Sequence, residues 1–241
     1  MVPNDPSDNP SPSAARAEIL RWTAGLGAVT AEALAIRLQV GVGSARARLL
    51  SAERRDLLAR HRPLADRPSL YTVTRSGLRA ISAPGLDPAR VSAAGASHLI
   101  ECAHVAAALE LSYPDHRVAG ERELRCEERE RGRALASAGL GVDAHAQPLR
   151  HRPDLVLWPR DPRAGLPVAI EVELTVKASE RLLAICRAWA RARCVAGVVY
   201  LVAPNVERAL LSAVDRARAQ ERIAIVPLEA LPRERPVPSG A

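Results

Sequence analysis

Residues 152–177 read RPDLVLWPRDPRAGLPVAIEVELTVK. Two apolar runs, 154–158 and 168–174, flank a loop of proline, glycine, arginine and aspartate, and this pattern predicts two strands of a hairpin. In the second run, apolar residues alternate with Ala169, Glu171 and Glu173. Because successive side chains of a strand point to opposite faces, we expect Glu171 and Glu173 to leave the same face, about 7 Å apart.

Asp154 begins the first of these strands and is a candidate third carboxylate, provided that the hairpin register places it opposite the second strand. Carboxylates this close repel one another unless a cation or a proton compensates them. Clusters of oxygen ligands suit Mg²⁺ or Mn²⁺. We therefore predict a metal site at Asp154 and Glu171, with Glu173 beside it. The alternative is that Glu171 and Glu173 line the solvent face of an edge strand.

Lys177 follows the strand that carries the paired carboxylates. The chain has 34 lysine and arginine residues, and Lys177 is the single lysine among them. A lysine can lose its proton when it is buried, whereas an arginine keeps its charge. We interpret Lys177 as a candidate catalytic residue; the alternative is that its position is due to chance.

The composition predicts a protein without membrane segments. The 241 residues fit one large or two small domains, and aromatic residues make up 2% of the chain, so its cores must be built from leucine, valine and alanine. No apolar run approaches the roughly 18 residues of a transmembrane helix, and the N-terminus lacks the basic and apolar regions of a signal peptide. We therefore expect a cytoplasmic protein with no membrane partner.

The cysteines form no CxxC pair, and we expect them to be reduced thiols. They are Cys102, Cys126, Cys186 and Cys194. His98, Cys102 and His104 are close in sequence, with Cys126 further on, which would allow a zinc site. Their spacing matches no common zinc finger, so our preferred interpretation is that they are ordinary helical residues.

Positive charge is concentrated near the N-terminus. Residues 15–82 hold 12 arginines and five acids, so this segment alone carries the formal charge of +7 that the whole chain has. Such a concentration indicates a polyanionic partner, most simply double-stranded DNA.

The N-terminal pattern predicts a helix-turn-helix followed by a hairpin. A helix is expected from Ala15 to Leu26, and a second begins after its N-cap Thr30. Gly41-Val42-Gly43 separates this helix from a third over 43–55. Short strands at 57–59 and 70–73 and a helical turn over 74–81 follow.

The remaining pattern predicts a layered α/β unit. We expect helices near 98–111, 179–193 and 205–220 and strands at 195–203 and 222–228. Residues 117–125 are expected to form a strand that carries Glu121 and Glu123. Residues 126–139 fit a helix or an irregular excursion, and 140–150 show no clear pattern.

Residues 15–82 resemble a winged helix domain, in which a hairpin follows the recognition helix and the sequence LYTVTRSGLRAI closes the wing. The resemblance implies that the helix over 43–55 enters the major groove of DNA. It places Ser44, Arg46, Ala47 and Arg48 against base edges, Arg54 and Arg55 near the DNA backbone, and Arg62 and Arg67 on the wing.

The C-terminal half resembles the PD-(D/E)xK nuclease-like fold of restriction endonucleases and resolvases. Pro153-Asp154 matches the first part of the motif, and Glu171 matches its acid. Glu173 stands where the lysine of the motif usually lies. Lys177, which the resemblance places on the following helix, would take the role of that lysine. The resemblance implies that Asp154, Glu171, Glu173 and Lys177 form a catalytic site for Mg²⁺- or Mn²⁺-dependent phosphodiester hydrolysis, with Arg187 and Arg191 guiding the DNA.

The whole chain resembles the replication-relaxation family of plasmids and mobile elements. The shared segments are His98 with its helix, residues 121–125, residues 152–154, and Glu171-Val172-Glu173 before the helix over 181–189. The resemblance implies an α/β (α+β) protein in which a winged helix-turn-helix precedes a restriction-endonuclease-like domain with a central mixed sheet. The expected boundaries are a disordered tail (1–14), a winged helix (15–82), a linker (83–94), a nuclease-like domain (95–232) and a second tail (233–241).

Two functions remain open. The first is a DNA-binding protein that is also a metal-dependent nuclease in the maintenance of mobile elements. The alternative is a non-catalytic transcriptional regulator or antitoxin-like protein with a degenerate nuclease fold. A homodimer is compatible with either function.

Overall fold

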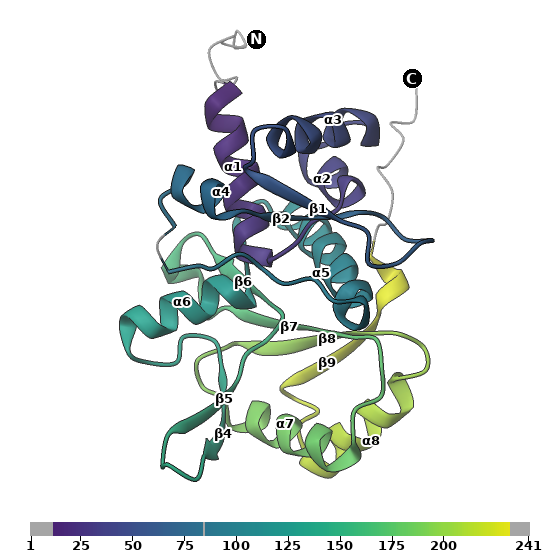
Figure 1. Ribbon diagram of the computed structural model, residues 1–241. Helices are drawn as coiled ribbons and strands as arrows, with labels where there is room; N and C mark the ends of the chain where they lie inside the picture. Colours follow the sequence, from purple (N-terminus) through teal and green to yellow (C-terminus); the bar gives the residue numbers. More distant parts are fainter. Residues whose placement is uncertain (1–11, 84, 232–241) are drawn as a thin grey trace, which may run out of the picture.

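The protein, seen here as a computed structural model that describes residues 12–83 and 85–231, is a mixed α/β structure (Figure 1). An N-terminal helical region with a small hairpin precedes a five-stranded mixed sheet with helices. The N-terminal elements are α1 (Pro12–Leu26), α2 (Ala31–Leu38), α3 (Val42–Glu53), β1 (Leu58–His61), β2 (Leu70–Val73) and α4 (Arg75–Ala80). Helix α1 thus begins at Pro12 rather than at Ala15. The rest of the predicted N-terminal tail and residues 232–241 lie outside the described part of the chain.

Threonine caps define the helices of the N-terminal region. The Thr30 side chain accepts a hydrogen bond of 3.1 Å from the Ala33 amide, as its position predicted. The Thr74 side chain caps α4 in the same way through the Gly77 amide, at 3.0 Å. Between these caps, β1 and β2 pair antiparallel, with Leu58 opposite Val73.

The large sheet has the strand order β3-β6-β7-β8-β9. Its strands are β3 (His116–Gly120), β6 (Leu155–Pro159), β7 (Val168–Glu173), β8 (Gly197–Val202) and β9 (Ile223–Pro227). Strand β6 runs antiparallel to both of its neighbours, β3 and β7. Strands β7, β8 and β9 run parallel to one another. Strand β7 therefore lies at the centre of the sheet.

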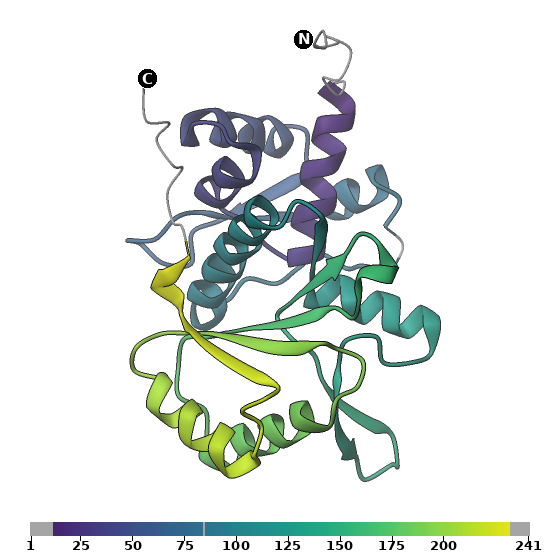
Figure 2. The same cartoon turned by 180° about the vertical axis from the view of Figure 1, so that it is seen from behind.

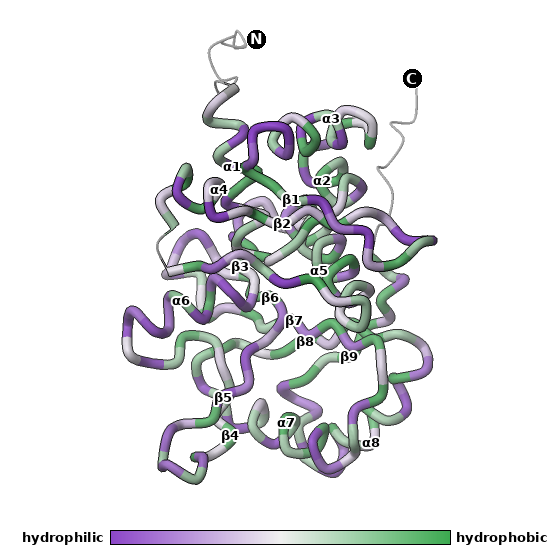
Figure 3. The backbone as a smooth tube through the Cα atoms, viewed as in Figure 1, coloured by the Kyte–Doolittle hydropathy of each residue, from purple (hydrophilic) through white to green (hydrophobic). Residues whose placement is uncertain are grey.

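The sheet is covered on both faces (Figures 1 and 2). Helix α5 (Ala93–Ser112) packs on one face, where Ile170 and Val172 enter the core. Helices α7 (Ser179–Arg191) and α8 (Glu207–Ala217) cover the other face, where Ala169 and Tyr200 are buried. The hydropathy of the chain follows this arrangement, because α5 is mostly hydrophobic and the peripheral α6 is mostly hydrophilic (Figure 3).

The N-terminal region and the sheet share one apolar core. A single cluster of buried residues runs from Leu20 in α1 and Leu34 in α2, through Ala103 of α5, to Ile170 in the sheet. Helix α5 can serve as the shared element because buried side chains surround it on nearly all sides.

The segment 116–151 differs from its predicted structure. Glu121 and Glu123 lie in helix α6 (Glu121–Arg131), not in a strand. The helix is favoured there because glutamates occupy its first turn, arginines its last turn, and Gly132 ends it in the left-handed conformation with φ 64°. The unpatterned residues 140–150 belong to a hairpin of β4 (Ala138–Val142) and β5 (Pro148–His151).

The alternative environment considered for the two glutamates of β7 is wrong. Glu171 and Glu173 are 3% and 4% exposed on a central strand, so they do not line the solvent face of an edge strand.

Candidate functional site

Asp154, Glu171, Glu173 and Lys177, the four predicted catalytic residues, line one cavity of about 630 Å³. The end of β7, the N-terminal half of α5 and the connection from β5 to β6 enclose it. The hairpin register pairs Leu155 with Ile170, so Asp154 comes level with Glu171, as the predicted site requires.

The carboxylate of Asp154 is held by two elements. Its Oδ2 accepts a 2.8 Å hydrogen bond from the Val172 amide of β7, and its Oδ1 lies 2.9 Å from Nε2 of His98 on α5. The hydrogen bond to Asp154 raises the pKa of His98 above its ordinary value. At neutral pH this pair therefore favours a proton on His98 more than a free histidine does.

Glu171 is buried against two other side chains. Its Oε1 accepts a 3.1 Å hydrogen bond from Nε1 of Trp189 on α7 and lies 2.6 Å from Nε2 of His151 on β5. Burial raises the pKa of Glu171, while His151 opposes that shift. Burial works against the charged form of His151, but the hydrogen bond and charge of Glu171 leave its pKa raised.

Glu173 pairs with Lys177, whose Nζ donates to Glu173 Oε2. Lys177 lies in the segment between β7 and α7, not on the following helix as the family resemblance implied. The ammonium of Lys177 nevertheless contacts Glu173, the residue that stands at the lysine position of the motif.

Arginines surround the acids of the cavity. Those that line it are Arg125, Arg150, Arg152 and Arg181. Among the described residues, neither Arg150 nor Arg181 forms an ion pair, so both are available to an anionic ligand. Arg187 and Arg191, which the resemblance placed against DNA, lie on α7 and do not line the cavity.

Two histidines complete the site, and their roles did not follow from the sequence pattern. His98 is separated from Asp154 by 56 positions, so only the packing of α5 on the sheet brings them together. His151 comes two positions before Pro153, and this proximity to the Pro-Asp motif was an available signal.

The residues predicted to contact DNA lie elsewhere. They occupy α3 and its C-terminal end and the loop between β1 and β2, and their side chains are exposed: Ser44, Arg46, Arg48, Arg54, Arg55, Arg62 and Arg67. None of them lines the carboxylate cavity. The structure thus presents two separate candidate surfaces, one basic and exposed, the other a cavity with buried acids.

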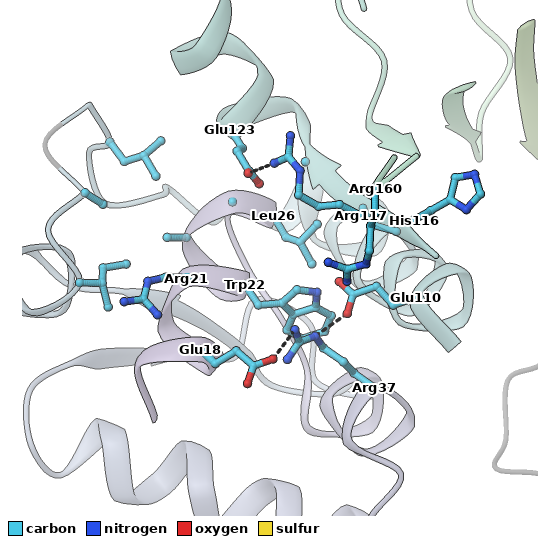
Figure 4. A pocket seen from close by; sticks show the side chains of 17 residues that line it. Glu18, Arg21, Trp22, Leu26, Arg37, Glu110, His116, Arg117, Glu123 and Arg160 are labelled. Carbon is cyan, nitrogen blue, oxygen red and sulfur yellow. Dashed lines mark hydrogen bonds and ion pairs between the residues drawn. The ribbon is translucent and has the colours of Figure 1, made fainter. Parts of the chain in front are cut away.

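A second cavity, of about 390 Å³, lies where α1 and α2 meet α5, α6 and β3 (Figure 4). Arg37 reaches Glu110 at 2.6 Å and Glu18 at 2.9 Å, and its guanidinium lies over the ring of Trp22. Arg117 pairs with Glu123 on the opposite wall. Because the acids of this cavity are paired, we interpret it as a polar seam between the N-terminal region and the sheet.

In the part of the chain that the structure describes, no helix is long and apolar enough to cross a membrane. No protein-family model, curated protein or solved structure matches the chain.

Proposed function

We propose that this chain is a DNA-binding protein of the replication-relaxation type whose sheet carries a metal-dependent phosphodiesterase site of the PD-(D/E)xK kind. The observation that carries the proposal is the convergence of Asp154, Glu171, Glu173 and Lys177 in one cavity, in the hairpin register that the motif requires. The unpaired arginines of the rim suit the phosphates of a nucleic acid.

The carboxylates of the cavity offer oxygen ligands to a divalent cation, although among the described residues they do not form a group of three ligand atoms within 4.8 Å of one another. Three carboxylates on a central strand and its neighbour supply oxygen ligands, and two of them are almost fully buried. Asp154 and Glu171 would hold Mg²⁺ or Mn²⁺, with Glu173 beside them. A bound ion there would lower the pKa of a coordinated water and stabilise negative charge on the scissile phosphate.

The protein side chains would perform the remaining tasks. Lys177 would orient or deprotonate the attacking water, or neutralise charge on the phosphate, and its ammonium already lies at Glu173. Arg150 and Arg181 would hold the backbone of the nucleic acid against the cavity.

A second function has an observation of its own. Each acid has a partner: Asp154 contacts His98, Glu171 contacts His151, and Glu173 contacts Lys177. These pairs compensate the carboxylates without a metal ion, which favours a non-catalytic DNA-binding regulator built on a nuclease-like fold.

A cleavage assay separates the two functions. Purified protein is incubated with supercoiled, nicked and linear DNA and Mg²⁺ or Mn²⁺, beside Asp154→Ala, Lys177→Ala and Lys177→Arg. We expect the wild type to convert supercoiled DNA and both alanine variants to lose this activity. Lys177→Arg keeps the charge but cannot act as a base, so it separates the two roles of Lys177. Asp215→Ala, an exposed acid of α8, is the control. DNA that is bound but not cut by the wild type would exclude the nuclease.

DNA binding is tested separately on α3. We expect Arg54→Ala and Arg55→Ala, at the end of α3 that is assigned to the DNA backbone, to weaken binding to duplex DNA and to reduce the slope of log affinity against log salt by about 1 for each phosphate that the variant no longer binds. Arg208→Ala changes an exposed arginine of α8 and should leave both quantities unchanged. Equal effects of all three variants would contradict a specific role of α3.

A further inference from the structure

Three different ligand atoms meet at the inner wall of the carboxylate cavity. His98 and Cys102 are four positions apart on α5 and therefore lie on one face of that helix. Cys102 Sγ is 3.4 Å from His98 Nε2, and Asp154 Oδ1 is 2.9 Å from the same nitrogen. All three atoms lie within 4.8 Å of one another.

These separations resemble those around a tetrahedral metal ion. Zinc bonds to nitrogen, oxygen and sulfur are about 2.0–2.3 Å long, so neighbouring ligand atoms lie about 3–4 Å apart. Two of the three separations are already near these values, and the third, between Cys102 Sγ and Asp154 Oδ1, is at most 4.8 Å, so closing the cluster around an ion needs shifts on the order of an ångström. Such shifts are available to His98, whose side chain is 40% exposed.

Access to the cluster comes from one side. Cys102 is buried in the apolar core and does not line the cavity, whereas His98 and Asp154 do. An ion held by these three residues would keep its fourth position open to the cavity. Three protein ligands with one open position are the arrangement of catalytic rather than structural zinc sites.

The chemistry of the donors selects the ion. A thiolate and an imidazole favour zinc and similar transition metals, while Mg²⁺ prefers oxygen ligands alone. We propose that the cavity binds one Zn²⁺-like ion through His98 Nε2, Cys102 Sγ and Asp154 Oδ1. Binding would release the Cys102 thiol proton and any proton shared between His98 and Asp154.

This ligand set differs from the zinc site considered from the sequence. Cys126 Sγ donates to the Gly85 carbonyl at 3.0 Å, so it belongs to another part of the molecule. Neither His104 nor Cys126 joins the described cluster, and Asp154 takes their place. The proposal rests on the proposed function in so far as the two share Asp154, but metal binding can be measured without DNA.

Cobalt is a suitable probe because a thiolate ligand gives Co²⁺ an intense charge-transfer absorption. The full chain is titrated with Co²⁺ and then with Zn²⁺, and the bound metal is counted by equilibrium dialysis. We expect one equivalent, with a charge-transfer band that Zn²⁺ abolishes. Cys102→Ser should lose the band, and His98→Asn should weaken binding by at least about 100-fold. Cys126→Ser, a cysteine outside the cluster, should keep both.

Several outcomes would overturn this proposal: no band in the wild type, a band that persists in Cys102→Ser, or unchanged affinity in His98→Asn. The His98 variant provides an independent test if the buried Cys102 variant does not fold. Mg²⁺-dependent cleavage by a protein that does not bind Co²⁺ would contradict the proposed zinc-like site and support the proposed nuclease. A cobalt band that depends on Cys102, in a protein that does not cut DNA, would support the proposed zinc-like site and contradict the proposed nuclease.

Discussion

Glu171 is the residue of the cavity whose environment is most restricted. It is 3% exposed, and its Oε1 receives a hydrogen bond from Trp189 and a close contact from His151. A buried carboxylate that loses a donor keeps its desolvation cost without the compensating interaction. The indole of Trp189, which is fully buried, is therefore as much part of the site as the acids.

Replacing Trp189 with phenylalanine removes this donor and preserves most of the ring. We expect the free energy of unfolding to fall by about 1–3 kcal/mol because the hydrogen bond is missing, with a further decrease from the smaller ring. Urea denaturation of Trp189→Phe, Glu171→Leu and the double variant isolates the hydrogen bond, because leucine has no acceptor for the indole. Trp158→Phe, at a half-buried tryptophan of β6, is the control. Additive effects of the two single variants would contradict the coupling.

A second buried acid has a structural role. Glu128 of α6 is 2% exposed and accepts hydrogen bonds from the Leu135 amide and the Ser137 hydroxyl. Its other oxygen lies 2.9 Å from Nε of Arg152, which precedes the Pro-Asp motif. This ion pair fixes α6 to the segment that leads through Asp154 into β6.

Arg152→Ala would leave Glu128 as an unpaired buried charge. We expect the free energy of unfolding to fall by about 3–5 kcal/mol. A Glu128→Gln and Arg152→Met double variant should recover much of this stability because it removes both charges. Thermal or urea unfolding measures both effects. A double variant no more stable than Arg152→Ala would show that packing, not charge, dominates at this position.

The acids of the cavity and Lys177 were predictable from sequence, and the two histidine partners were not. Alternation along 168–174 places Glu171 and Glu173 on one face, and a hairpin register brings Asp154 level with Glu171. His98, by contrast, reaches Asp154 only through the packing of a helix that carries no local sign of its neighbour.

At the scale of elements, the close approach of α4 to β1 depends on a glycine. A Cβ built on Gly77 would lie 2.2 Å from the Leu57 carbonyl oxygen and 2.6 Å from Val73 Cγ1. Backbone cannot move aside as a flexible side chain can. Gly43, in the first turn of α3, has open space around its Cβ position.

The same substitution should therefore have opposite effects at these two helical glycines. We expect Gly77→Ala to destabilise the protein by about 1–3 kcal/mol through overpacking. Gly43→Ala should stabilise it by up to about 1 kcal/mol, because alanine favours a helix over glycine. Urea denaturation of both variants tests the pair. Equal effects would show that the contact at Gly77 relaxes at little cost.

Most elements with a strong apolar period were predicted, and the errors fall where that period is weak. Helix α6 buries Leu124 and Glu128, and its other charged residues gave no clear period. The correct signals were at its ends, in the acids of the first turn and in Gly132. The β4–β5 hairpin is largely exposed, so no hydrophobic pattern marked its strands.

At the scale of the whole molecule, the polar seam between the N-terminal region and the sheet is expected to respond to pH. Burial raises the pKa of Glu110 above its ordinary value of 4.5, and the opposing charge of Arg37 does not cancel this shift. Between that ordinary value and the raised one, the folded protein binds more protons than the unfolded chain. The contribution of Glu110 to stability therefore falls as the pH rises through this window.

Glu110→Gln removes this titration. We expect the free energy of unfolding to fall less between pH 4.5 and pH 7 in the variant than in the wild type. Urea denaturation across this range measures the difference, and Glu207→Gln, at an exposed acid of α8, is the control. Parallel pH profiles of the wild type and Glu110→Gln would contradict the prediction.

Strand β7 pairs with β6 on one side and with β8 on the other, and its residues are almost entirely buried. Amide protons in such a strand exchange with solvent mainly when the whole protein opens. The carboxylates of the cavity should therefore keep their positions through local fluctuations and lose them in one cooperative event. The Val172 amide donates to Asp154 itself, so its exchange rate would report on the cavity directly.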